Sequence, residues 1–83
     1  MEPVGTLLKI ARIKSGLNQE EVIARLFKMG ISLTQVSLSR YENDRREVGT
    51  DLLKALSIIY GIPVSELIWS REEIQLYGIK GRE

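Results

Sequence analysis

The sequence holds few residues with which to catalyse a reaction. It contains no cysteine and no histidine. Thiolate metal sites and disulfides are therefore excluded, and so is the side chain that most often serves as general base or metal ligand. The remaining candidates are carboxylates such as those of Glu20 and Glu21. Neighbouring residues on a helix point about 100° apart, so these two carboxylates do not face each other. We therefore expect no enzymatic activity, no metal site and no cofactor.

Residues 35–42 indicate a different chemistry, that of a surface which another molecule binds. Leu38 and Tyr41 are the candidates for core positions in this segment, and the positions before and between them are Gln35, Val36, Ser37, Ser39 and Arg40. A short helix with such a mixed face is poorly suited to packing and well suited to recognition. A charged loop, Asn43-Asp44-Arg45-Arg46-Glu47, follows it directly.

Five short helices are predicted to position this segment. Apolar periodicity and the residues that start and stop helices place them at residues 3–15, 19–29, 35–42, 50–60 and 64–69. Asn18 and Glu21 form a capping box, Thr34 is a favourable N-cap, and Pro3 suits the first helical turn. Glycines at positions 16, 30 and 61 follow three of the helices. No strand is indicated, so we expect an all-α fold.

Apolar residues at helical spacing predict the core of this fold. The predicted core positions are Val4, Leu8, Ala11, Val22, Ile23, Leu26, Phe27, Leu38, Leu52, Leu53, Leu56 and Ile59. A second apolar set lies off this pattern, on the first helix at Leu7, Ile10 and Ile13 and near the C-terminus at Trp69, Ile74, Leu76, Tyr77 and Ile79. Either the C-terminal segment folds back over the first helix, or both surfaces meet a second subunit.

Size and composition agree with one small domain. The chain has 83 residues, 43% of them hydrophobic and 28% charged, and a net charge of +1. No apolar run approaches the roughly 18 residues that a membrane span needs, and the N-terminus lacks a secretory pattern. We expect a cytoplasmic protein with a domain at residues 1–69. Residues 70–83 form an extension, in which a capping box at Ser70–Glu73 predicts a further helical turn or two through Tyr77.

Several segments resemble the lambda-repressor and Cro-like helix-turn-helix family, also called the XRE family. Residues 16–22, Gly-Leu-Asn-Gln-Glu-Glu-Val, are similar to the opening of that family's second helix, and residues 38–43, Leu-Ser-Arg-Tyr-Glu-Asn, to the end of its third. Positions in the first helix and in the last two also match, so the resemblance covers about residues 4–68. Between Leu26 and Thr34 this chain has about five residues more than the family, and Asp44 stands where the family usually has glycine.

The resemblance implies that residues 35–42 form the recognition helix of a DNA-binding domain. We expect Gln35, Val36, Ser39 and Arg40 to contact bases. A glutamine amide can bond to N6 and N7 of adenine together, and Val36 could pack against a thymine methyl group. Phosphate contacts are expected from Gln19, Thr34, Asn43, Arg45 and Arg46, although helix capping or exposure to solvent would equally explain these residues. In the family, Arg12 and Glu42 form a partly buried ion pair, so we assign them a structural role.

The predicted function is sequence-specific DNA binding by a transcriptional regulator. The resemblance implies a homodimer on a palindromic operator, acting on the nucleoid as a Cro-like repressor, an antitoxin-type autoregulator or a restriction–modification controller. The alternative is an antitoxin-like interaction module whose main partner is another protein. Salt-sensitive DNA binding would distinguish the two.

Overall fold

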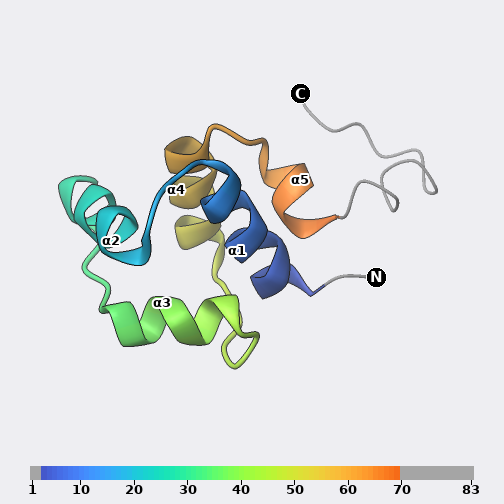
Figure 1. The fold of residues 1–83 in the computed structure, drawn as a ribbon, viewed down its shortest axis with the longest axis horizontal. Helices are drawn as coiled ribbons and strands as arrows, with labels where there is room; N and C mark the ends of the chain where they lie inside the picture. Colours follow the sequence, from blue (N-terminus) through green and yellow to red (C-terminus); the bar gives the residue numbers. More distant parts are fainter. Residues whose placement is uncertain (1–2, 70–83) are drawn as a thin grey trace.

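Five helices form the part of the chain that the computed structural model describes, residues 3–69. They are α1 (Val4–Lys14), α2 (Gln19–Lys28), α3 (Gln35–Glu42), α4 (Thr50–Tyr60) and α5 (Val64–Ile68). Figure 1 shows α3 along one edge of the molecule, with α1 and α2 on its inner side, and α3 packs against both. No strand occurs within these residues, so the predicted all-α fold class is confirmed.

The helices that flank the turn begin at the predicted capping residues. The Asn18 side chain accepts a hydrogen bond from the Glu21 N–H at 2.8 Å, and the Glu21 carboxylate accepts one from the Asn18 N–H at 2.9 Å. The Thr34 hydroxyl accepts from the Ser37 N–H at 3.1 Å. Pro3 differs slightly from the prediction. Its ψ of 151° is extended, so it precedes α1 instead of occupying the first turn.

Four of the five helices end with the same backbone motif. A residue with positive φ follows the helix, and the next N–H donates to the carbonyl five residues earlier, the Schellman arrangement. The left-handed residues are Gly16, Gly30, Asp44 and Gly61. Asp44 has a φ of 59°, a conformation that aspartate tolerates better than most residues. The substitution of aspartate for the family's glycine therefore leaves this turn intact.

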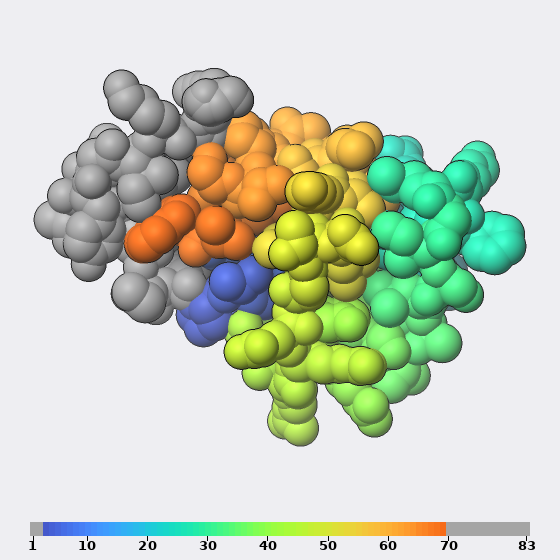
Figure 2. Space-filling model, turned by 180° about the vertical axis from the view of Figure 1, so that it is seen from behind, coloured from blue at the N-terminus to red at the C-terminus, as the bar shows by residue number. Residues whose placement is uncertain are grey.

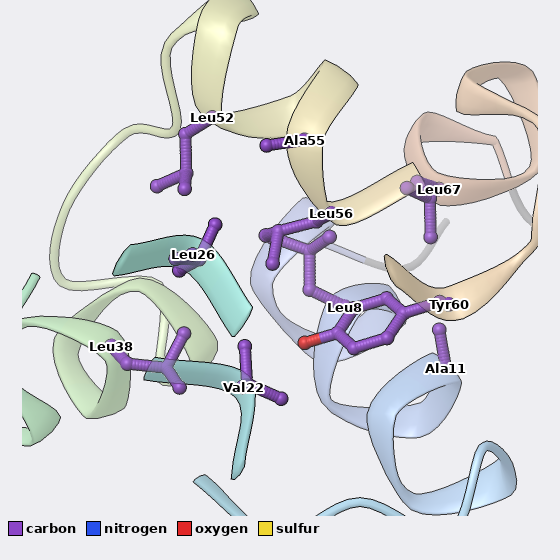
Figure 3. Packing of buried hydrophobic residues seen from close by; sticks show 10 residues of the cluster. All are labelled: Leu8, Ala11, Val22, Leu26, Leu38, Leu52, Ala55, Leu56, Tyr60 and Leu67. Carbon is purple, nitrogen blue, oxygen red and sulfur yellow. The ribbon is translucent and has the colours of Figure 1, made fainter. Parts of the chain in front are cut away.

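The core lies between all five helices. Figure 3 shows Leu8 and Leu56 at its centre, with Val22, Leu26 and Leu38 on one side and Tyr60 and Leu67 on the other. The side chains buried with them are Ala11, Leu52 and Ala55. Predicted core residues Val4, Ile23, Leu53 and Ile59 are partly buried and pack against this cluster.

Phe27 was predicted to be buried, and this prediction is wrong because its side chain is 71% exposed. Ile23, four residues before Phe27 on the same side of α2, packs against the core, but the end of the helix that carries Phe27 is left uncovered. The segment that follows α2 turns back to the core instead. Ile31 and Leu33, in the connection between α2 and α3, pack against the core cluster and thereby fix the start of α3.

The C-terminal extension, residues 70–83, lies outside the part of the chain that the structure describes. Ile74, Tyr77 and the helical turns predicted after Ser70 lie outside the described residues. Trp69 is half-buried and follows α5 with an extended backbone. Within residues 3–69, the helices are all too short or too polar to cross a membrane.

Candidate nucleic-acid interface

The outer face of α3 is exposed and its inner face is buried. Leu38 and Glu42 are the buried residues of this helix. They are four positions apart and hold it against the core. Val36 is 62% exposed, and Gln35 and Arg40 are exposed as well. Figure 2 shows green side chains of α3 projecting from the lower edge of the molecule, away from the core.

A shallow hollow runs along this outer face. It is lined by Gln19, Gln35, Val36, Ser39, Arg40, Asn43 and Arg45. All four residues predicted to contact bases line it, together with three of the five predicted to contact phosphates. The structure therefore brings together residues from α2, from α3 and from the loop that follows α3.

Thr34 and Arg46, the other two predicted phosphate contacts, do not line this hollow. The Thr34 hydroxyl caps α3 and donates a hydrogen bond to the Ser37 hydroxyl at 3.0 Å. The Arg46 guanidinium lies 5.5 Å from the centre of the Tyr41 ring, a cation–π distance. Arg46 also lines a second hollow, formed in part by Val4 and Leu53.

Two cations beside the hollow carry unpaired charge. Within residues 3–69 the ion pairs do not involve Arg40 or Arg45, and both side chains are exposed. The Asn43 amide is partly engaged, since its Nδ2 donates to the carbonyl and the hydroxyl of Ser39 at 2.9 and 3.3 Å. The oxygen of that amide makes no hydrogen bond within the described residues.

A buried ion pair joins α1 to the inner side of α3. Arg12 Nε donates to Glu42 Oε2 at 2.7 Å, and a terminal nitrogen of the same guanidinium donates to Oε1 at 3.2 Å. The other terminal nitrogen donates to the Leu17 carbonyl at 3.0 Å. The two side chains are 12% and 2% exposed. This is the pair implied by the family resemblance, and it joins α1 to the end of α3.

A chain of hydrogen bonds through two glutamines connects the ion pair to the exposed face of α3. Gln19 Nε2 donates to Glu42 Oε1 at 3.1 Å, and Gln35 Nε2 donates to Gln19 Oε1 at 3.1 Å. The sequence analysis did not predict this chain of bonds. No local signal pointed to it, because the two bonds join residues 23 and 16 positions apart.

Asp44 has a role that the sequence analysis missed. Its carboxylate accepts hydrogen bonds from the Gly5 N–H at 2.8 Å and from the Thr6 hydroxyl at 3.2 Å. It thereby caps the N-terminus of α1, where free N–H groups favour a negative charge. A Cβ atom on Gly5 would collide with the Tyr41 carbonyl oxygen, so the approach of α1 to the end of α3 requires glycine there.

Among residues 3–69, Tyr60 is the titratable residue whose pKa is clearly shifted. Burial, and then the nearby Glu42 carboxylate, raise this pKa well above its usual value, so the phenol stays protonated at physiological pH. Its hydroxyl makes no hydrogen bond to residues 3–69. The ring is part of the buried core cluster, as Figure 3 shows.

Comparison with known proteins agrees with this geometry. A helix-turn-helix family model matches residues 8–67, which include α2, the turn and α3. Searches of curated proteins and of solved structures each find no match. The matched family is a DNA-binding regulator fold and not an enzyme family. The chain therefore belongs to the XRE-type, lambda-repressor-like helix-turn-helix family of DNA-binding transcription regulators.

Proposed function

We propose that this protein is a repressor that binds a palindromic operator as a homodimer, with α3 in the major groove. The observation that carries the proposal is the hollow on the outer face of α3, which gathers base-bonding and phosphate-bonding side chains on one surface. The major groove of B-DNA is about 12 Å wide and admits a helix of this kind. A protein with this role acts in the cytoplasm, on the nucleoid.

In this arrangement Gln35, Val36, Ser39 and Arg40 contact bases. Gln35 begins α3, and the N-terminal residues of a recognition helix reach base edges. Phosphate contacts come from Gln19, Thr34, Asn43, Arg45 and Arg46, which lie before and after α3 or at the start of α2. Such contacts fix the register of the protein on the duplex and contribute affinity without sequence information.

A comparison of two variants tests the division between base and phosphate contacts. Gln35→Ala should lose roughly 1–3 kcal/mol of binding free energy on the cognate operator and almost none on scrambled DNA. Arg45→Ala should weaken binding to both DNAs alike and make the salt slope shallower by about one unit. The measurement is a titration of both variants against operator and scrambled DNA at two salt concentrations. If Gln35→Ala weakens binding equally on both DNAs, α3 is not presented as proposed.

Exposed apolar side chains favour a second candidate function, that of an antitoxin-like module whose main partner is a protein. Ile13 on α1 is 58% exposed and Phe27 on α2 is 71% exposed, and exposed apolar side chains of this size are suited to contacts with another protein. Gel shifts at increasing salt distinguish the candidates. Specific, salt-sensitive binding to an operator selected from random DNA supports the repressor, and the absence of any selected sequence supports the protein-binding module.

A further inference from the structure

The loop that follows α3 carries two adjacent arginines in different surroundings. Both side chains are exposed, and neither takes part in an ion pair within residues 3–69. The Arg46 guanidinium lies over the ring of Tyr41, 5.5 Å from its centre, whereas Arg45 lines the hollow along α3. At this distance the positive charge is attracted to the electron-rich face of the ring. Arg46 is therefore held in one position by a neighbouring side chain before any ligand binds.

The ring beside Arg46 is itself fixed by the fold. Tyr41 is half-buried on α3 and packs against the core cluster. The Asp44 N–H donates a hydrogen bond to the Tyr41 carbonyl at 3.1 Å, and the Asp44 carboxylate ties the same turn to the start of α1. Both the ring and the turn that leads from it to Arg46 are held in this way. The end of α3 therefore sets the position in which Arg46 stacks.

This position lies beside the proposed DNA-binding face. Arg46 lines the hollow between the first turn of α1 and the loop, and Arg45 lines both that hollow and the one along α3. The two hollows therefore adjoin at Arg45. With the N-terminal residues of α3 against base edges, the loop at the other end of the helix lies toward the sugar–phosphate backbone.

A guanidinium that is already in place binds a phosphate better than one that is free to move. An exposed arginine samples many rotamers and loses this freedom when it binds. Its apparent affinity is lowered in proportion to the fraction of time that it spends in the binding conformation. A cation–π contact at an exposed site favours the stacked conformation by roughly two- to fivefold. The N–H donors of a guanidinium lie in its plane, so stacking through its face leaves them free for a phosphate.

We infer that Tyr41 is a positioning residue that holds Arg46 ready for a DNA phosphate. This inference rests on the proposed function, since it assumes that Arg46 contacts the backbone. It gives Tyr41 a role besides packing in the core. A phosphate carries no sequence information, so removing the ring should weaken binding to operator and to scrambled DNA alike.

A double-mutant cycle on DNA affinity tests the inference. Dissociation constants are measured for the wild-type protein, Tyr41→Leu, Arg46→Ala and the double variant, on an operator selected from random DNA. Tyr41→Leu removes the ring and keeps an apolar side chain against the core. Two copies bind a palindromic operator, so the loss per copy is squared and binding should weaken roughly tenfold. The double variant should bind as well as Arg46→Ala alone, because the ring acts through Arg46.

Tyr41→Phe is the conservative variant at the same position. It keeps the aromatic face and should therefore keep the affinity. Arg45 supplies the matched control, since Arg45→Ala also removes a phosphate contact but not one held by a ring. Its cost should be the same in the wild type and in Tyr41→Leu. A general displacement of α3 in Tyr41→Leu would instead change the cost of both arginine substitutions.

A second comparison leaves Tyr41 in place. Arg46→Lys keeps the charge and loses the planar guanidinium, so it should weaken binding more than Arg45→Lys does. If Tyr41→Leu fails to fold, this comparison decides the matter. Equal losses from the two lysine substitutions would then overturn the inference.

The outcomes of the cycle separate the inference from the proposed function. Coupling between Tyr41 and Arg46, together with additivity between Tyr41 and Arg45, supports the inference. An equal cost of Arg46→Ala with and without the ring, in variants with the wild-type melting temperature, overturns it and leaves the proposed function standing. If the wild-type protein selects no sequence and shows no salt-sensitive binding to DNA, the proposed function fails and the inference fails with it.

Discussion

Glu42 places a negative charge inside the core of a small domain, and its partners explain how the fold tolerates it. The carboxylate accepts three hydrogen bonds, two from Arg12 and one from Gln19. Two apolar residues of similar volume would pack at least as well as a buried ion pair. They would, however, leave the Gln19 amide without an acceptor on its inner side. The ion pair is thus tied to the exposed face of α3 as well as to the core.

Removing either charge should destabilise the fold strongly. Arg12→Ala or Glu42→Ala should each cost about 3–5 kcal/mol of unfolding free energy, because a buried charge remains without its partner. The double variant should cost less than the sum of the two. Urea unfolding of the two single variants and of the double variant completes a double-mutant cycle. Simple additivity would show that the two side chains do not interact energetically.

Tyr60 also has a buried polar atom, but removing this atom should not destabilise the fold. Its hydroxyl makes no hydrogen bond to residues 3–69, although the ring packs in the core. Tyr60→Phe removes that hydroxyl and keeps the ring, so the unfolding free energy should stay within about 0.5 kcal/mol or rise. Tyr60→Leu, the control, changes the ring and should lower it. A loss of more than about 1 kcal/mol in the phenylalanine variant would reveal a partner for the hydroxyl.

At the scale of elements, α3 is held at both ends by groups from other helices. Its first residue, Gln35, bonds to the first residue of α2, and the residue after its C-cap, Asp44, caps α1. The buried Leu38 and Glu42 lie between these points. A helix of eight residues would be marginal alone, so the orientation of α3 depends on these tertiary contacts.

Asp44 combines two roles, and substitution can separate them. Asp44→Ala loses the cap on α1 and places a Cβ-bearing side chain of low left-handed preference at a φ of 59°, so about 2 kcal/mol of stability should be lost. Asp44→Asn keeps an oxygen for the Gly5 N–H and tolerates this backbone, so it should cost about 0.5 kcal/mol. Asp44→Gly relieves the backbone and loses the cap. Thermal melts of the three variants show how much stability depends on the cap and how much on the backbone conformation at position 44. Equal losses in the alanine and asparagine variants would contradict the cap.

Local signals predicted the helices, and nonlocal contacts escaped prediction. The capping box at Asn18, the cap at Thr34 and the glycines after α1, α2 and α4 act within a few residues, so the sequence alone locates those ends. The bonds from Gln35 to Gln19 and from Asp44 to Gly5 join residues 16 and 39 positions apart. Phe27 was misassigned for the same reason, because its exposure depends on which helices cover the end of α2. The family resemblance supplied the one long-range pair expected in advance, Arg12 with Glu42.

At the scale of the whole molecule, apolar side chains on α1 remain exposed. Ile10 is 38% and Ile13 is 58% exposed, and α5, which the half-buried Trp69 follows, packs against the same helix. The apolar residues Ile74 and Tyr77 follow in the sequence, outside the described residues. The palindromic operator that we propose would bring two copies together about a twofold axis, and a surface for self-association would favour this arrangement.

We expect the intact chain to self-associate through this surface. Burying Ile10 and Ile13 against a second subunit would stabilise the dimer through the hydrophobic effect. Replacing both with glutamate should therefore raise the dimer dissociation constant at least roughly tenfold. Phe27→Gln is the control, since it removes an apolar side chain that is more exposed than either isoleucine and lies on another helix. Sedimentation equilibrium provides the constants. An intact chain that is monomeric, and that dimerises only when residues 70–83 are deleted, would instead mean that the C-terminal segment covers α1 within one chain. Pairing on DNA would then be the remaining source of symmetry.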